Sequence, residues 1–189
     1  MTLFRTVDPT VEPVSLAEAK AHLRVAHDSE DALISDLVRT ARQEVEQMTA
    51  TALIHQCWRL VLDDWPQEEV VLLKRKPVRE ILSVTVFDAD GAGSVMAPDA
   101  YQLDAASTPA RLHLADRPTP GLALNGIEID FSAGFGEAGT DVPDLLKRAM
   151  LLLVAHWYEF RGAFGPDSQP VSVPDEYRRL LAAWQGPRL

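Results

Sequence analysis

Cysteine is scarce in this sequence, and long apolar runs are missing. The 189 residues contain one cysteine, Cys57, so no disulfide can form within the chain and no cysteine-rich metal site can be built. No run of about 18 apolar residues is present, so no membrane-spanning helix is expected. The N-terminal segment lacks the basic stretch and apolar run of a signal peptide. These absences predict a protein made and kept in a cytoplasm-like compartment.

Basic charge is also in short supply. The chain has 18 Lys and Arg against 28 Asp and Glu, a formal net charge of −10. This balance argues against a protein that grips nucleic acid by neutralising phosphates, although DNA could pass such a surface without adhering to it. The 47% hydrophobic content is ordinary for a soluble globular protein, and the length suits one domain, residues 1–189, with a sizeable core.

The residue patterns of catalytic and metal sites are absent from the sequence. The five histidines have no HxxxH or HxH spacing beside a carboxylate, and His156 falls within an apolar helix, where a packed histidine is expected. No serine occupies a GxSxG motif, and Cys57 lies within a predicted strand as a small buried hydrophobe. We therefore expect no enzymatic activity, no cofactor and no metal.

Three glycines resemble a nucleotide-binding motif. Gly134, Gly136 and Gly139 form GxGxxG between a strand and a helix, and Glu159 follows at about the spacing of the dinucleotide fingerprint. That fingerprint requires a second parallel strand after the helix, but here only a loop and another helix follow. We interpret the glycines as a turn. The alternative is a small cytoplasmic nucleotide-binding protein or enzyme that uses the Gly134–Gly139 turn.

The first 50 residues predict an extended arm followed by two helices. Residues 1–14 carry turn-forming residues and no periodicity, so they are expected to form the arm. Ser15 and Glu18 make a capping-box pattern at the start of the first helix, within the helical stretch 15–50. Asp28 is the expected N-cap of a second, amphipathic helix that ends at Thr49. The polar face of this helix is expected to hold Asp36, Arg39, Gln43 and Glu46.

The middle of the chain, residues 54–132, has the period of β-strands. Trp58, Leu60 and Leu62 alternate with their neighbours, as do Leu82, Val84 and Val86. Asp90-Gly91 predicts a hairpin turn. Other strands are expected at Val70–Leu73, Tyr101–Asp104, Arg111–Leu114 and Ile127 to Phe131.

The C-terminal part is predicted to be helical again. A long helix spans residues 142–162 with Asp141 as N-cap, and it is apolar over most of its circumference. Such a helix lies either in a core or against a neighbouring chain. Residues 163–189 are expected to form a loop, a short helix and a C-terminal tail. The predicted fold is α+β, a helical bundle formed by N- and C-terminal helices with an inserted antiparallel β section.

A short basic run follows the second predicted strand. Lys74, Arg75, Lys76 and Arg79 could contact a phosphate or an acidic partner. A solvated sheet edge, protected against aggregation by its charges and by Pro77, explains the same run equally well.

The order of these segments resembles the phage head-tail connector, or adaptor, family, including the adaptors of gene transfer agents. The segments that carry the resemblance are SLAEAKAHLRV, DSEDALISDLVRTARQEVEQMT, KPVREILSVTVFDADG, IEIDFSAGFG, VPDLLKRAMLLLVAHWYEFRGA and VPDEYRRLL. Together they span nearly the whole chain. Each of these segments consists of residues that determine the local fold and carry no catalytic chemistry.

The resemblance implies a structural protein of the virion neck, in a phage or a virus-like particle assembled in a bacterial host cytoplasm. Its expected partners are the portal protein, the stopper and tail proteins, and roughly twelve copies of itself in a closed ring. DNA would pass through the channel of that ring without specific binding, and no membrane is involved. The portal-binding residues implied are Tyr177, Arg178, Arg179, Trp184, Arg188 and Leu189. A different neck component, a stopper or tail completion protein, is the alternative within this class.

Overall fold

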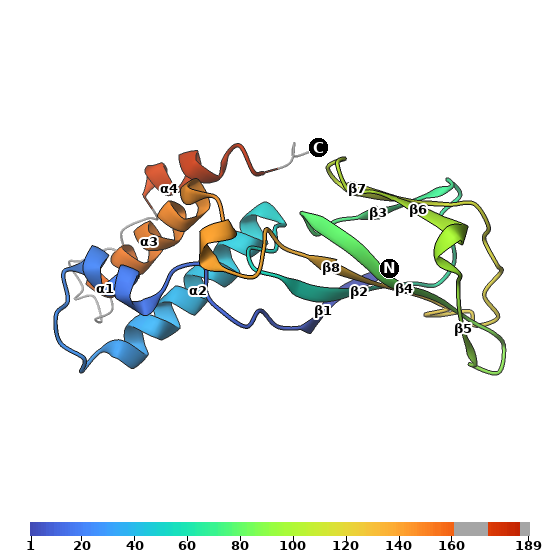
Figure 1. The fold of residues 1–189 in the computed structure, drawn as a ribbon, viewed down its shortest axis with the longest axis horizontal. Helices are drawn as coiled ribbons and strands as arrows, with labels where there is room; N and C mark the ends of the chain where they lie inside the picture. Colours follow the sequence, from blue (N-terminus) through green and yellow to red (C-terminus); the bar gives the residue numbers. More distant parts are fainter. Residues whose placement is uncertain (161–173, 186–189) are drawn as a thin grey trace, which may run out of the picture. The chain divides into compact units, whose positions relative to one another are not determined.

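The computed structural model describes residues 1–160 and 174–185 (Figure 1). Contacts within the chain divide it into a β unit, Met1–Thr10 and His55–Phe135, and a helical unit, Val11–Ile54 and Gly136–Leu189. The strands pair antiparallel throughout the two described sheets. The α+β class, with an antiparallel β section inserted between N- and C-terminal helices, is therefore confirmed.

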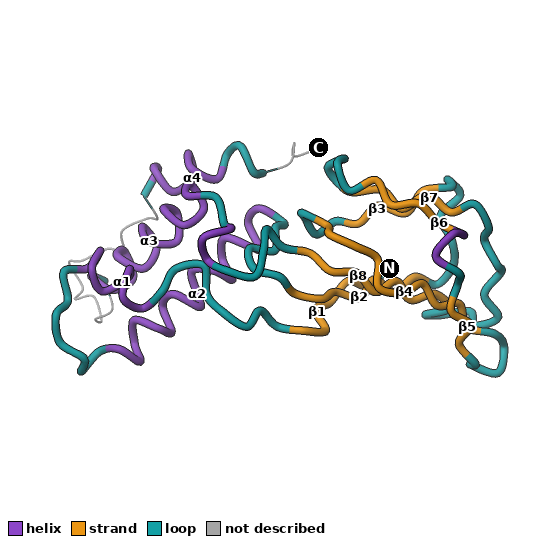
Figure 2. Tube along the Cα trace, viewed as in Figure 1, coloured by secondary structure: helices purple, strands orange, loops and turns teal. Residues whose placement is uncertain are grey.

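The β unit consists of two sheets, which Figure 2 shows as two layers of strands. The larger sheet has the order β1-β2-β8-β4-β5, and the smaller sheet has the order β3-β7-β6. The strands of the larger sheet are β1 (Thr2–Val7), β2 (Gln56–Leu62), β8 (Ile127–Ala133), β4 (Val78–Phe87) and β5 (Gly93–Val95). The smaller sheet comprises β3 (Val70–Leu73), β7 (Ala110–Leu114) and β6 (Tyr101–Asp104), which follows the 3-10 turn η1 (Pro98–Ala100).

The core of the β unit follows from the period-two pattern of its strands. Leu60, Ile129 and Phe131 of the larger sheet are fully or almost fully buried, as are Leu73 and Leu112 of the smaller sheet. In the first half of β2 and of β8, the residues between these buried positions are more exposed. The alternation seen in the sequence therefore sets which face of each sheet is buried.

Two residues of the β unit differ from the sequence-based expectation. Leu82 was expected on the buried face with Val84, but it is exposed because the register shifts between Ile81 and Ser83. A bulge adds one residue to a strand, so one side chain no longer follows the alternation between the buried and the exposed face. Cys57 is only partly buried, because it lies opposite Val7 and Ser132 on the less protected face of β2.

The N-terminal arm is a strand of the larger sheet. β1 pairs with β2, with Leu3 opposite Leu60 and Arg5 opposite Trp58. The turn-forming residues that suggested an extended arm lie after Val7, so they end the strand and do not prevent it. β5 was also not predicted, because three residues are too few to show a period.

The helical unit packs two long helices together. Its helices are α1 (Leu16–Leu23), α2 (Asp31–Thr49), α3 (Asp144–Glu159) and α4 (Asp175–Leu181), with a 3-10 turn, η2 (Gly139–Asp141), before α3. α2 contacts α3, and α3 contacts α4. The buried residues include Ile34 and Val38 of α2, and Leu146, Met150 and Leu153 of α3.

The capping box at the start of α1 is confirmed. Ser15 Oγ accepts a hydrogen bond from the Glu18 N–H at 3.2 Å, and the Glu18 carboxylate accepts one from the Ser15 N–H at 2.8 Å. These hydrogen bonds lower the pKa of Glu18, with the backbone bond from Ser15 as the largest cause.

The two other predicted N-caps were wrong. Glu30, not Asp28, precedes α2, and Asp28 instead accepts a hydrogen bond from Lys20 Nζ at 2.6 Å. Asp141 belongs to η2, where its carboxylate accepts from the Ala138 N–H at 3.0 Å, and Pro143 precedes α3. α3 ends at Glu159, and the last two residues predicted for it lie outside the described part of the chain.

Candidate functional site

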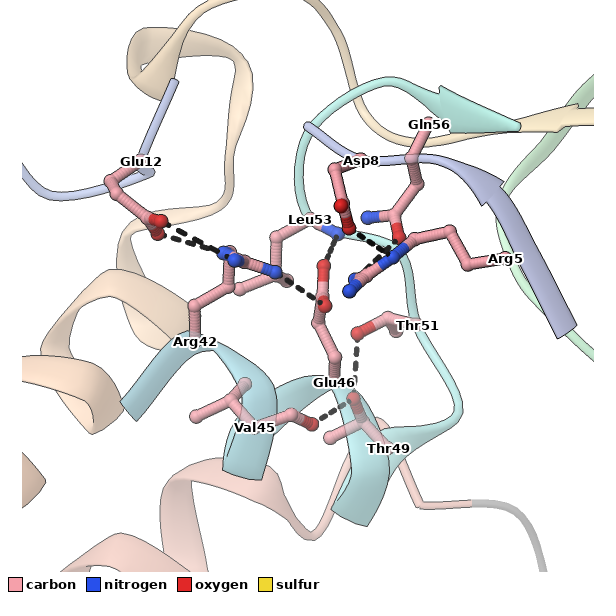
Figure 3. Close-up of polar contacts among 10 residues, drawn as sticks. All are labelled: Arg5, Asp8, Glu12, Arg42, Val45, Glu46, Thr49, Thr51, Leu53 and Gln56. Atoms are coloured by element: carbon pink, nitrogen blue, oxygen red, sulfur yellow. Dashed lines mark hydrogen bonds and ion pairs between the residues drawn. The ribbon is translucent and has the colours of Figure 1, made fainter. Parts of the chain in front are cut away.

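A buried ion-pair network lies in the helical unit (Figure 3). Arg42 of α2 is 4% exposed and Glu46, one turn later, is 5% exposed. Arg42 Nε donates to Glu12 Oε2 at 2.7 Å, and Arg42 Nη1 donates to Glu46 Oε2 at 3.1 Å. Burial works against the charge of Arg42, but the ion pairs with Glu12 and Glu46 outweigh it and raise the pKa of the guanidinium.

The same network fixes a second chain segment. Glu46 Oε1 accepts a hydrogen bond from the Leu53 N–H at 2.9 Å. Thr49 Oγ1 donates to the Val45 carbonyl at 2.6 Å and lies 2.6 Å from Thr51 Oγ1. The network thus fastens Glu12 and the segment after α2 to that helix, as Figure 3 shows. The network joins carboxylates, a guanidinium, threonine hydroxyls and backbone groups of three chain segments, and its contacts hold these segments in position.

The sequence did not reveal this network. Glu46 was expected on the solvent face of α2, but Glu12 and Leu53 approach that face, and Glu46 is buried there. The Arg42 and Glu46 spacing of four residues was the available signal, since such pairs lie side by side on a helix. Nothing in the spacing says that a pair will be covered by segments from elsewhere in the chain.

The glycine-rich turn is explained by its own chain. Gly134 has a φ of 140°, a backbone conformation that other residues rarely adopt. A Cβ at Gly136 would lie 2.1 Å from Asp141 Oδ2, and a Cβ at Gly139 would lie 2.6 Å from the Pro13 carbonyl oxygen. Gly134 is therefore favoured by its backbone conformation, and Gly136 and Gly139 by their close neighbours, which supports the interpretation of the motif as a turn.

The predicted portal-binding residues differ in exposure. Arg178 and Arg179 are exposed on α4, and Trp184 is half-buried. Tyr177 is 3% exposed, and its buried hydroxyl has no hydrogen-bond partner among the described residues. Burial, followed by the nearby Glu44 carboxylate, raises the pKa of Tyr177. The last two members of the set, Arg188 and Leu189, lie outside the described residues, and the set stays a prediction.

The wide apolar face of α3 is only partly buried. Leu146, Ala149 and Leu153 are buried in the helical unit, whereas Leu145 and Phe160 are exposed. One side of the helix is therefore core. A second side remains available to a neighbouring chain.

The basic run between β3 and β4 has mixed surroundings. The guanidinium of Arg75 lies 4.2 Å from the ring centre of Trp58, a cation–π contact. Burial lowers the pKa of Lys76, while Lys74 and Arg79 are exposed. Arg79 falls at a register shift of β4, which fits the expected protected sheet edge.

The described residues, 1–160 and 174–185, contain neither a candidate metal site nor a helix suited to span a membrane. No group of three or more His, Cys, Asp or Glu side chains in this part is placed to hold a metal ion. Within the same ranges, no helix has the length and apolar character needed to cross a membrane.

Residues 13–86 match the sequence pattern of the phage gp6-like head-tail connector proteins. The resemblance seen in the sequence is therefore confirmed: the chain has the features of a head-tail connector over this stretch. No curated protein matches the chain.

Solved structures extend the similarity to the full length. A chain in the neck of an empty gene transfer agent particle, computed with C6 symmetry, is 28% identical with a TM-score of 0.83. A chain in the virion of a native gene transfer agent particle and one in the neck of the native particle computed with C12 symmetry are each 28% identical with TM-scores of 0.81. All three alignments cover 100% of this chain and 97% of the other.

Proposed function

We propose that the protein is a structural component of the virion neck, a head-tail connector that forms a ring of about twelve copies. The observation that carries this proposal is the match of the whole chain to chains in gene transfer agent particles, two of them in the neck. The C12 symmetry used for one neck supports the number of copies. The ring is assembled from subunits made in a bacterial cytoplasm.

The partners in this proposal are the portal on one side and the stopper or tail proteins on the other. Arg178, Arg179 and Trp184 of the α4 region, with Arg188 and Leu189, are proposed to contact the portal. The burial of Tyr177 gives it a different role, since it packs within its own unit and supports α4. The net charge of −10 suits a channel wall along which DNA moves without adhering.

The proposal assigns no enzymatic activity to the chain. Its most buried charged group, the Arg42 network, is occupied in holding the helical unit together. The glycine turn, on which a nucleotide-binding function would depend, is filled by Asp141 and approached by Pro13. A nucleotide would have to displace these contacts.

The test is to purify particles from a strain that encodes this chain and to image their necks by electron cryomicroscopy. We expect density that fits the β unit and the helical unit, repeated around the axis between portal and tail. Complete particles without this density would overturn the proposal. The next experiment would then be a thermal-shift screen with nucleotides, in which a saturable rise in melting temperature supports the alternative.

A further inference from the structure

The two edges of the five-stranded sheet are protected to different degrees. β1 forms one edge with six residues and exposes Phe4 (45%) and Val7 (52%); it carries Arg5 and one register shift, between Arg5 and Val7, but neither lysine nor proline. The β4 side is blunted: β5 covers only Thr85 to Phe87, and β4 carries register shifts at Arg79 and Leu82. Natural sheets usually blunt exposed edges against pairing with other chains, and the apolar Phe4 and Val7 that remain exposed on the more regular β1 edge suggest a contact made in the assembled state.

Exposed apolar side chains lie on the same face at both edges of this sheet. Phe4 is opposite Arg59, and Arg59 forms ion pairs with both Glu128 and Asp130, which places Phe4 on their face. Val95 is opposite Thr85, which is opposite Glu128, so Val95 lies on that face too. Val95 is 69% exposed. The part of this face that lies between the two edges is polar.

A hollow of about 500 Å³ adjoins the β5 edge. Its lining includes Val86, Phe87, Val95 and Met96, with Asp88 and Asp116 at its polar side. The hollow can receive apolar side chains that project from another molecule. β1 has no carboxylate between Thr2 and Val7, and the carboxylate of Asp8, next to Val7, forms an ion pair with Arg5 at 2.7 Å.

From these features we infer that neighbouring subunits join edge to edge, with Phe4 and Val7 of β1 packing against Val95 and the adjoining hollow of a second copy. The inference rests on the proposed ring. A cyclic ring requires two different, complementary surfaces on each subunit, and opposite edges of one sheet satisfy this requirement. A contact of β1 with β1 would instead be two-fold symmetric and would not by itself generate a cyclic ring.

Cysteine crosslinking tests this pairing directly. With Cys57→Ser removing the only native cysteine, Phe4→Cys and Val95→Cys are made in separate, differently tagged full-length chains. Both chains are produced together in particle-forming cells, and purified particles are oxidised and analysed without reductant. We expect a disulfide-linked pair that contains both tags, and no linked pair in particles that contain only one of the two variants.

The control pairs Phe4→Cys with Leu72→Cys. Leu72 is also exposed, but it lies in β3 of the smaller sheet, so no crosslink to Phe4→Cys is expected. Linked pairs in particles with Phe4→Cys alone would overturn the inference in favour of a β1–β1 contact. Particles whose necks contain the chain but give no crosslink between the two variants would also overturn it. Necks that lack the chain would instead refute the proposed function.

Discussion

At the scale of single residues, substitution of the buried Arg42 is expected to have a large effect on stability. Arg42→Met removes the ion pairs with Glu12 and with Glu46, whose buried carboxylate is 5% exposed. We expect a loss of about 3–5 kcal/mol in the free energy of unfolding, measured by urea denaturation. Arg39→Met on the exposed face of the same helix is the control and should change stability by about 0.5 kcal/mol or less. Equal effects of both substitutions would contradict the role of the network.

Tyr177 presents the opposite case, a buried polar group without a partner. Tyr177→Phe removes the hydroxyl whose burial is uncompensated in the described structure, so stability should stay unchanged or rise by up to about 1 kcal/mol. Tyr177→Ala removes the ring from the core and should cost about 3–5 kcal/mol. Both values come from the same denaturation experiment. A large loss for Tyr177→Phe would show that the hydroxyl has a partner.

Asp104 supplies a dependence of stability on pH. Hydrogen bonds from Ser107, followed by those from Arg111, lower the pKa of Asp104 from 3.8 to about 2. Because the folded-state pKa lies below the ordinary value, the carboxylate stabilises the fold above about pH 4. This contribution is lost as the pH falls from there towards 2. The difference in melting temperature between the native chain and Asp104→Asn should shrink over this window and be constant above it.

At the scale of elements, the start of α1 depends on its capping box. Ser15→Ala removes the acceptor for the Glu18 N–H and should cost about 1 kcal/mol, measured by urea denaturation. Ser29→Ala is the matched control, since Ser29 precedes α2 without capping it and bonds only to His27 among the described contacts. A loss for Ser29→Ala as large as that for Ser15→Ala would indicate that the caps were assigned wrongly.

The sequence predicted most elements because their periods are set by burial. β2, β8 and the helices carry clear alternation or helical spacing, and each lies where its pattern indicated. The errors occur where a distant contact overrides a local pattern. Leu82 is turned outward by a bulge, and β1 is formed by pairing with β2, about 50 residues away in the chain. Asp28 and Asp141 have capping chemistry, but the backbone starts each helix later.

The candidate site was less predictable than the fold. The exposed arginines of α4 follow from its sequence, whereas the burial of Tyr177 depends on α2 and α3. Glu46 is a second example. On an isolated helix its side chain would face solvent, but in the folded chain Glu12 and Leu53 cover it. The sequence does not show which strands form the two edges of the larger sheet. These edges can therefore be compared only once the strand order is known.

At the scale of the whole molecule, the portal contact can be tested without disturbing the core. Deleting residues 174–189 would uncover the core as well as remove the contact, because Tyr177 and Leu181 are buried. Arg178→Glu with Arg179→Glu changes only exposed charges. We expect this double variant to remain folded and to bind purified portal at least about tenfold more weakly, in a pull-down titration. Arg39→Glu is the control, and an equal loss there would point to a general charge effect.

The strand order also constrains how the protein is made. Among the described residues β8 is the last strand, yet it lies between β2 and β4 and pairs with both. During synthesis, β2 and β4 emerge early and have no central partner until Ile127–Ala133 leaves the ribosome. The sheet is therefore completed late, by insertion of one strand into a gap, and nascent chains that stall before it expose two unsatisfied edges to chaperones and proteases.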